Sequence, residues 1–254
     1  MTRTLDFNCD LGEGDDDAAV MPFISSASIA CGFHAGDAAT MAQTVALCLQ
    51  YGVAIGAHPS HDDRAHFGRR ALPITPEDAY ALVRTQIGLL QDIARQAGTA
   101  LQHVKPHGAL YNQAARDPAL AGAIAAAVRD SDPQLLLFGL SGSALTQAGQ
   151  RVGLRVVQEV FAERAYEADA TLTPRGTAGA TLPTTAAACE QVLQMLRTGS
   201  VTARTGQYVA LVADSLCLHG DRPDAAAFAR ALRDTLDAAG CRVARPFSAQ
   251  DPTA

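Results

Sequence analysis

Residues 135–160 read LLLFGLSGSALTQAGQRVGLRVVQEV and contain one complete period of a pattern that recurs along the chain. The apolar run Leu135–Gly139 leads through Gly and Ser into a helical pattern over Ser143–Val152, which stops at Gly153. A second apolar run, Arg155–Val160, follows directly. Short apolar runs without polar alternation are typical of strands buried on both faces of a parallel sheet. The stretch therefore predicts two parallel strands joined by a helix.

The same alternation extends over the whole chain. The predicted strands are Thr4–Cys9, Ala27–Gly32, Ala54–His58, Leu101–Lys105, Leu135–Gly139, Arg155–Val160 and Tyr208–Cys217. Helical periodicity, capping residues and terminal glycines predict helices over Ala38–Tyr51, Thr75–Ala97, Asp117–Val128, Ser143–Val152, Thr184–Arg197 and Pro223–Ala239. No linker is visible, so we expect a single α/β domain over residues 1–254. Seven strands favour a closed barrel over an open sheet, although a TIM barrel has eight.

Composition excludes several classes of protein. The chain has 254 residues, 48% of them hydrophobic and 18% charged, which is typical of a folded domain and not of a disordered one. A net charge of −6 gives no electrostatic reason to expect nucleic acid or an anionic membrane as a partner. No apolar run approaches the roughly 18–20 residues that span a bilayer, and no signal peptide precedes the first strand, so we expect a cytoplasmic protein. The six cysteines lack paired spacing and are expected to be buried thiols.

Polar side chains follow the predicted strands at the points where these end: Asp10, His34, His58, Lys105, His107, Glu159, His219 and Asp221. Because the carboxyl ends of parallel strands face one crevice, we expect these residues to meet there. Lys105 is the only lysine among 20 basic residues, which suggests a position that needs a compact ammonium group. His103 lies on the same side of its strand as Lys105, so it is expected to pack inside the barrel.

Three further features of the sequence give only weak indications of function. His66 lies in a polar loop and is expected to be solvated. The run Asp15–Asp17 is expected to form a loop or the first turn of a helix. Residues Gly139–Ser143 open a helix and could present N–H groups to an anion, but they lack the Gly-Lys-Ser/Thr ending of a P-loop.

Aspartate, histidine and lysine in one crevice indicate hydrolytic chemistry. Carboxylates and imidazoles can activate water and protonate a leaving nitrogen, while an ammonium can hold an oxyanion or a phosphoryl group. The same carboxylates and imidazoles could instead bind Zn²⁺ or a similar metal that activates water. Both routes lead to hydrolysis of a C–N bond, and the residues alone leave the choice open.

Seven strings, in order along nearly the whole chain, carry a specific resemblance: DFNCDLGEG (6–14), IACGFHAGD (29–37), GAHPS (56–60), FGRR (67–70), QHVKPHGALYN (102–112), EVFAERAY (159–166) and CLHGD (217–221). Together they resemble the LamB/YcsF family, the A subunits of ATP-dependent 5-oxoprolinases. The resemblance implies a seven-stranded (β/α) barrel, a distorted TIM-like fold similar to that of glycoside hydrolases and polysaccharide deacetylases. The chain departs from the family pattern in a shortened loop after Gly14, in residues 61–66, and in Glu163, where aspartate is common.

The resemblance also implies an activity: the cyclic amide of 5-oxo-L-proline is hydrolysed to L-glutamate with cleavage of ATP, together with two further subunits, B and C. On this basis the expected catalytic residues are Asp10, His58, Lys105, His107 and His219. The expected substrate-binding residues are Asn8, His34, Arg70, Glu159, Arg164 and Asp221. ATP is the expected cofactor, and candidates for a divalent metal site are Asp10, His34 and His58.

Two other interpretations stay open at this stage. A metal-dependent deacetylase or amidohydrolase acting alone would bind metal and work without ATP. A non-catalytic subunit that presents the substrate to its partners would tolerate substitution of Asp10, Lys105 and His219.

Overall fold

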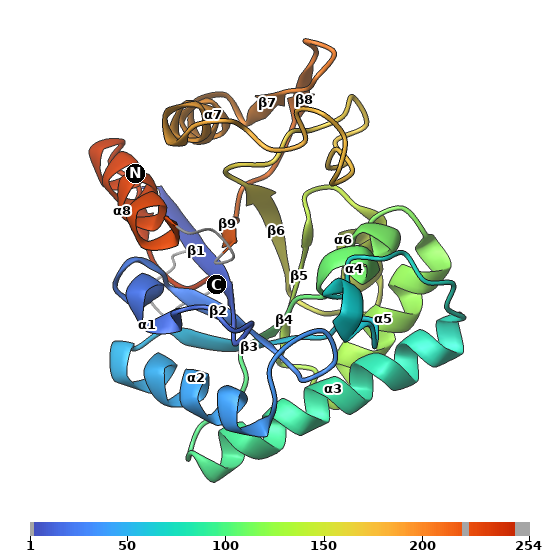
Figure 1. The fold of residues 1–254 in the computed structure, drawn as a ribbon. Coiled ribbons are helices and arrows are strands. Elements are labelled where there is room, and N and C mark those ends of the chain that lie inside the picture. Colours follow the sequence, from blue (N-terminus) through green and yellow to red (C-terminus); the bar gives the residue numbers. More distant parts are fainter. Residues whose placement is uncertain (1–2, 220–223, 247–254) are drawn as a thin grey trace.

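The computed structural model describes residues 3–219 and 224–246, and its centre is a closed parallel barrel (Figure 1). Each of seven strands pairs in parallel with the next, and the ring closes because β9 pairs with both β6 and β1. The barrel strands are β1 (Thr4–Leu11), β2 (Ser26–Ala30), β3 (Ala54–His58), β4 (His103–Val104), β5 (Leu136–Leu140), β6 (Val156–Phe161) and β9 (Ser215–His219). The predicted seven-stranded barrel is therefore confirmed.

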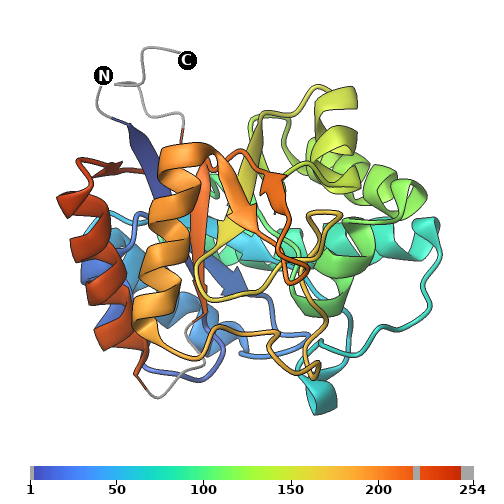
Figure 2. The same cartoon turned by 90° about the horizontal axis from the view of Figure 1, so that it is seen from above.

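Helices surround the barrel, as Figures 1 and 2 show. They are α1 (Asp17–Val20), α2 (Ala38–Tyr51), α3 (Pro76–Gln96), α4 (Gly108–Ala114), α5 (Pro118–Ser131), α6 (Ala144–Arg151), α7 (Thr185–Thr198) and α8 (Ala225–Ala238), with the 3₁₀ turns η1 (Met21–Phe23) and η2 (Arg64–His66). The six predicted helices agree with α2, α3, α5, α6, α7 and α8, apart from Pro223, which lies outside the described residues. The caps explain this agreement: the side chains of Thr75 and Asp117 accept from N–H groups of the first turn, and Gly52 and Gly199 end helices in the left-handed region.

The prediction of one strand over Tyr208–Cys217 is wrong. Residues Tyr208–Ala210 form β8, which pairs in antiparallel fashion with β7 (Ser200–Thr202) in a separate two-stranded sheet. The chain then leaves the strand conformation and enters the barrel only at Ser215. Between the two strands, Asp214 bonds to the backbone N–H of Gln158, which fixes this change of direction. The sequence analysis also missed α4 and the short strand β10 (Arg242–Val243), which pairs with β1.

Side chains of β1 alternate between two environments. Phe7, Cys9 and Leu11 belong to the apolar layer between barrel and helices. The residues between them, Asp6, Asn8 and Asp10, are also buried, and their contacts lie inside the barrel. Because neighbouring residues of a strand point to opposite faces, the barrel interior receives every second residue. In this protein the interior is largely polar, whereas TIM barrels fill it mainly with branched aliphatic residues.

The other end of the barrel is closed by His103 and apolar side chains. The ring of His103 stacks on Phe138 with 4.4 Å between centroids, and its Nε2 lies 3.3 Å from Ser28 Oγ. Phe138, Leu136 and Val157 form a small buried cluster of their own. Gly56 makes room for the ring, because a Cβ at this position would collide with the imidazole of His103. The prediction that His103 packs inside the barrel is confirmed.

The structure also describes the state of the cysteines and the character of the helices. All six cysteines are free thiols, as predicted; five are buried, but Cys189 is only half-buried. None of the helices within residues 3–219 and 224–246 has the length and apolar character that crossing a bilayer requires.

Asp6 makes the stability of the barrel depend on pH. Its carboxylate accepts hydrogen bonds from Ser25, Ser26 and Ser215, but burial raises its pKa from 3.8 to about 6. Between about pH 4 and 6 the unfolded chain loses this proton before the folded chain does, so the free energy of unfolding falls as pH rises through this window, by up to about 3 kcal/mol.

We therefore expect Asp6→Asn to become more stable relative to the wild type as pH rises from 4 to 7. Urea unfolding of both proteins at several pH values measures this difference. Stability curves that stay parallel over this range would contradict the assignment to Asp6.

Candidate active site

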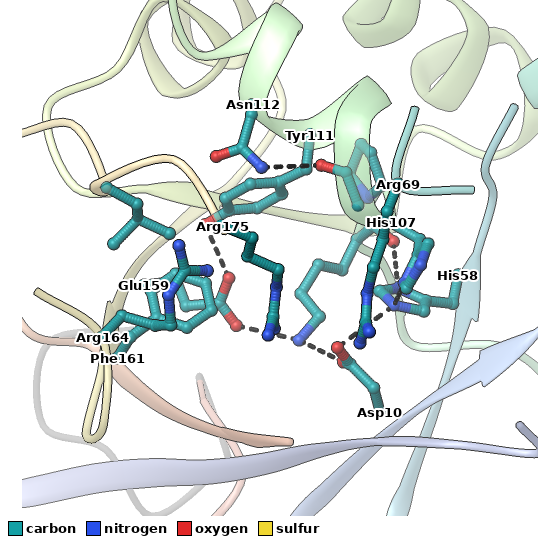
Figure 3. A pocket seen from close by; sticks show the side chains of 14 residues that line it. Asp10, His58, Arg69, His107, Tyr111, Asn112, Glu159, Phe161, Arg164 and Arg175 are labelled. Atoms are coloured by element: carbon teal, nitrogen blue, oxygen red, sulfur yellow. Dashed lines mark hydrogen bonds and ion pairs between the residues drawn. The ribbon is translucent and has the colours of Figure 1, made fainter. Parts of the chain in front are cut away.

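A polar pocket opens where the carboxyl ends of the barrel strands meet (Figure 3). It is lined by Asp10, His58, Arg69, Lys105, Pro106, His107, Gly108, Tyr111, Asn112, Glu159, Phe161, Arg164, Leu172 and Arg175. Strands β1, β3 and β6 contribute Asp10, His58 and Glu159, while Lys105 and His107 directly follow β4. The expected gathering of chemistry-bearing residues at one end of the barrel is thus observed.

Lys105 is a buried cation held between two carboxylates. Its Nζ lies 2.5 Å from Asp10 Oδ1 and 3.1 Å from Glu159 Oε1, and it donates to Asn8 Oδ1 at 2.7 Å. Cys217 Sγ lies 3.3 Å away as a further acceptor. Burial disfavours the ammonium, but the charge of Asp10 leads the opposing contributions and holds the pKa of Lys105 well above its usual value. Four acceptors around three N–H groups keep this side chain in one position.

Glu159 links the ammonium group of Lys105 to Tyr111 on the other side of the pocket. Its Oε1 accepts from Asn8 Nδ2 at 2.9 Å, and its Oε2 accepts from the hydroxyl of Tyr111 at 2.6 Å. Burial, followed by the neighbouring Glu159 carboxylate, raises the pKa of Tyr111 well above its usual value. Tyr111 therefore stays protonated and acts as a donor. Asn8 lies beneath the pocket, and its side chain is hydrogen-bonded to both Lys105 and Glu159.

Three buried histidines lie beside Asp10 and turn one nitrogen each toward a common point. His58 Nδ1 lies 2.7 Å from the Lys105 carbonyl oxygen, and His107 Nε2 lies 2.9 Å from that of Phe67. His34 Nδ1 lies 2.8 Å from Ser60 Oγ, whose own proton goes to the His61 carbonyl. Since each of these acceptors needs an N–H donor, the outer nitrogens carry the protons. The inner nitrogens therefore present lone pairs.

These lone pairs face each other and a carboxylate. His58 Nε2 lies 2.9 Å from His107 Nδ1, and Glu13 Oε1 lies 2.9 Å from His34 Nε2 and 3.3 Å from His107 Nδ1. The four ligand atoms all lie within 4.8 Å of one another. Burial lowers the pKa of His34 to about 2 and that of His107 well below its usual value. Imidazole nitrogens and a carboxylate that converge in this way suit a small cation, because ligands at about 2.1 Å from a tetrahedral metal are roughly 3.4 Å apart.

The loop beside these histidines depends on two glycines. Gly68 has φ +61°, and a Cβ there would lie 3.0 Å from both His107 Cδ2 and His34 Cβ. Gly108 has φ +56°, and a Cβ there would lie 2.6 Å from the carbonyl oxygen of Gly68. Phe67, whose carbonyl fixes the His107 ring, also has a positive φ of 55° although it carries a side chain. The backbone is thus held close to the histidines in a conformation that few residues adopt.

Three arginines face the pocket: Arg164 and Arg175 lie across it from the histidines, and Arg69 lies beside His58 and His107 (Figure 3). Arg164 is buried and donates from Nε and Nη2 to the carbonyl oxygens of Ala180 and Thr173. Its Nη1 has no acceptor among the described residues. Arg69 and Arg175 are exposed residues whose guanidinium groups point toward Lys105 and Asp10 in this view. Burial lowers the pKa of Arg164 to about 10, with the charge of Arg175 as the next contribution.

The structure brings most of the sequence-predicted residues together. Asp10, His58, Lys105, His107, Glu159 and Arg164 line the pocket, Asn8 lies beneath it, and His34 belongs to the adjoining histidine group. Arg70 does not line it: its side chain is 55% exposed and lies 3.5 Å from Asp63. The backbone of His219 pairs with that of Asp10, which places it at the same end of β9, and Asp221 lies outside the described residues.

Sequence analysis missed several residues of the site. Glu13, and not Asp10, completes the group of possible metal ligands with His34, His58 and His107, although Asp10 Oδ2 lies 3.3 Å from His58 Nε2. Glu13 and Tyr111 stand inside the strings that carried the resemblance, so that signal was available. Arg69 also stands inside one of these strings, FGRR, from which Arg70 was chosen instead. Arg175 gave no signal, because it lies outside all seven strings.

The structure also describes the acidic run at Asp15–Asp17, His66 and residues 139–143. Asp17 begins α1 and its carboxylate accepts from the backbone N–H of Gly12, so the first-turn interpretation holds for it. His66 is half-exposed and bonded to Asp63. Residues 139–143 do not line the pocket; Ser143 caps α6, and the N–H of Gly142 donates to Gln158.

A closed parallel barrel with a buried ammonium, carboxylates and imidazoles at the carboxyl ends of its strands defines an α/β-barrel protein with an enzyme-type site. The family model described as LamB/YcsF matches residues 5–251. The chain belongs to the LamB/YcsF family.

Similar proteins support this assignment. A protein of Bordetella pertussis, named as the A subunit of 5-oxoprolinase, is 54% identical over 249 residues, which are 96% of this chain and 99% of that protein. The crystal structure of a lactam utilization protein from Thermus thermophilus is 42% identical and has a TM-score of 0.88, covering 95% of this chain and 99% of that one. The catalytic domain of a peptidoglycan N-acetylglucosamine deacetylase from Eubacterium rectale is 10% identical, covers 99% of this chain and 91% of that one, and has a TM-score of 0.54. That last likeness concerns the fold alone.

Proposed function

We propose that this chain is the component of an ATP-dependent 5-oxoprolinase in which the lactam ring of 5-oxo-L-proline is opened to L-glutamate, and that it works with two partner subunits, B and C. Relatives named as A subunits of 5-oxoprolinase match nearly the whole chain at about half identity, which supports the substrate and the need for partners. The observation that carries the proposal is the buried Lys105–Asp10–Glu159 arrangement beside the histidines. It offers a fixed carboxylate next to an imidazole, as water activation requires.

Each pocket residue has its own role in the proposed reaction. Asp10 is oriented by Lys105 through Oδ1, which leaves Oδ2 beside His58 Nε2 at 3.3 Å. A water molecule held by Asp10 Oδ2 loses its proton to this carboxylate as it attacks the lactam carbon. The ring nitrogen then takes a proton as the C–N bond breaks. Arg164 Nη1 is directed to bind the carboxylate of the substrate, because a guanidinium matches a carboxylate in geometry and charge.

We infer that Lys105 does not hold an oxyanion or a phosphoryl group, which the sequence suggests for an ammonium in this crevice. Its N–H groups are already used by Asp10, Asn8 and Glu159, so the ammonium has no free donor for an oxyanion in this state. We infer that Lys105 fixes Asp10 and keeps the carboxylates charged.

We also propose that Glu13, His34, His58 and His107 bind a divalent metal ion, since the inner nitrogens and the carboxylate converge. The outer nitrogens have the hydrogen-bond partners that typically orient metal-binding histidines. Such an ion, when bound, supplies a Lewis acid that lowers the pKa of coordinated water. This group also favours a second candidate function, a metal-dependent amidohydrolase that acts without ATP.

The assay that tests the proposal measures glutamate and ADP formed from 5-oxoproline and ATP, with the chain alone and with both partner subunits. We expect glutamate and ADP in equal amounts, and only when the partners are present. Partners shown to be active with the Bordetella pertussis protein, yet producing no glutamate with this chain, would contradict the substrate. Hydrolysis of acetylated amides by the metal-loaded chain without ATP would support the second candidate instead.

A further inference from the structure

A polar side chain, that of Gln86, is buried in the apolar contact between α3 and the barrel. α3 packs on the outside of the barrel against β3 (Figure 1). Its buried residues are Gln86 together with Ala79, Val83, Ile87, Leu90 and Ala94. Gln86 is 0% exposed. An amide buried among apolar side chains destabilises a fold unless it is hydrogen-bonded, so its partners have to lie within reach.

The amide of Gln86 bonds to the backbone of a single residue, Ser60, in both directions. Its Oε1 accepts from the N–H of Ser60 at 2.9 Å, and its Nε2 donates to the Ser60 carbonyl oxygen at 2.7 Å. Ser60 follows the last residue of β3 by two positions and lies outside regular secondary structure. Gln86 therefore supplies the pair of hydrogen bonds that a neighbouring strand would otherwise give to this backbone.

The segment that Gln86 holds positions two of the three histidines. Ser60 Oγ lies 2.8 Å from His34 Nδ1. The carbonyl oxygen of the preceding residue, Pro59, accepts the backbone N–H of His107 at 2.8 Å. The rings of His34 and His107 stack with 3.8 Å between their centroids, so a shift of one ring displaces the other.

We propose that Gln86 is a positioning residue of the active site, which holds His34 and His107 in place through Ser60. Gln86 itself makes a hydrogen bond to neither histidine. The inference rests on the proposed function, in which these histidines belong to a metal-binding group. Because ligand atoms have to lie within roughly 0.2 Å of their proper distance from a metal ion, a small displacement of Ser60 is enough to weaken binding.

The affinity of the chain for Co²⁺ tests this role. Gln86→Met keeps the length of the side chain and removes both hydrogen bonds to Ser60. We expect it to weaken Co²⁺ binding about tenfold, the lower end of the range for outer partners of metal-binding histidines, and to shift the visible absorption of the bound ion. Gln86→Ala removes the same bonds with a smaller side chain and should change affinity in the same direction. Wild-type affinity in both variants would overturn the proposal.

Leu90→Ala is the matched control, because Leu90 lies one turn further along the same buried face of α3. This change destabilises the packing of the helix but removes no hydrogen bond to Ser60. In urea unfolding it should be about as destabilised as Gln86→Met, yet it should bind Co²⁺ like the wild type. An equal loss of affinity in the two variants would show that Gln86 acts on stability alone, and the proposal would fail.

A double variant tests the route from Gln86 to the histidines. If Gln86 acts through Ser60, the losses of Co²⁺ affinity in Gln86→Met and Ser60→Ala share a path. The double variant should then lose less affinity than the product of the two single losses. Single losses that simply multiply would rule out this route.

NMR of the metal-free chain tests the positioning without a metal ion. The side-chain ¹⁵N signals of His34 and His107 should shift in Gln86→Met and stay unchanged in Leu90→Ala. A wild-type chain that binds no Co²⁺ would remove the proposed metal site, and these signals would then decide on Gln86. Signals that do not move in Gln86→Met would overturn the inference.

Glutamate formation by the assembled complex separates this inference from the proposed function. Gln86→Met should lower kcat and leave KM for 5-oxoproline nearly unchanged, because the histidines lie apart from Arg164, the residue proposed to bind the substrate carboxylate. A Gln86→Met complex with wild-type kcat would contradict the role of Gln86 and leave the proposed function intact. A wild-type complex that forms no glutamate would instead remove the proposed function itself.

Discussion

Replacing Lys105 by methionine should lower glutamate formation by the assembled complex by about 10²–10³-fold, the range seen when a fixed polar group of an active site is removed. The ammonium orients Asp10 at 2.5 Å and neutralises Asp10 and Glu159, whose side chains are 5% and 0% exposed. Without it, both buried carboxylates lose the cation that pairs with them. Breaking a buried ion pair in this way costs about 3–5 kcal/mol, so the variant should also unfold at lower denaturant concentration.

A double variant separates the loss of chemistry from the loss of stability. Lys105→Met combined with Glu159→Gln removes one positive and one negative charge, and so restores the charge balance inside the barrel. We expect it to regain much of the stability in urea unfolding while glutamate formation stays low. A double variant that is stable and also active would show that the ammonium is not needed for the reaction.

The second large effect is expected on the metal affinity of the histidine group, which consists of His34, His58 and His107 with Glu13. We expect the chain to bind one divalent transition metal ion, and His58→Ala and Glu13→Gln to reduce metal affinity by more than about 100-fold, because each removes a ligand. Ser60→Ala, which removes the partner of His34 Nδ1, should cost about 10–100-fold. Mass spectrometric metal content and the visible absorption of the Co²⁺-loaded protein measure these changes independently of activity.

His66→Ala is the matched control for this series, since His66 is 52% exposed and bonded to Asp63, outside the group. It should bind metal like the wild type. Wild-type protein that retains no metal after dialysis against Zn²⁺, or a series in which His66→Ala loses as much as His58→Ala, would contradict the site.

The barrel was predictable because its signals are local. Strands buried on both faces are short apolar runs, and helices such as α3 begin and end at caps written in the sequence, Thr75 with Pro76 at one end and Gly98 beyond the other. The split between β8 and β9 was not predictable, because residues 208–217 are apolar throughout most of their length. Pairing of β8 with β7 and the bond of Asp214 to Gln158 decide it, and both are tertiary contacts that a local pattern does not contain.

The location of the site was predictable from the sequence, but only some of its residues were. Residues at strand ends, such as Asp10, His58 and Lys105, follow from the rule that parallel strands end at a common face. Arg69 and Arg175 come from loops, and their convergence depends on how those loops are held. The sequence analysis chose Arg70, but the positive φ of Gly68 and the packing of Gly108 against its carbonyl fix the loop so that the adjacent Arg69 lines the pocket.

The layer formed by His103, Phe138, Leu136 and Val157 determines from which end of the barrel small molecules reach the pocket. Among the described residues this layer closes the far end of the barrel, and the pocket opens at the carboxyl ends of the strands. In the proposed reaction the lactam enters and glutamate leaves by this opening, past Arg69 and Arg175. A partner protein seated over that opening would decide when a turnover begins and when it ends, without contacting any of the groups that break the ring.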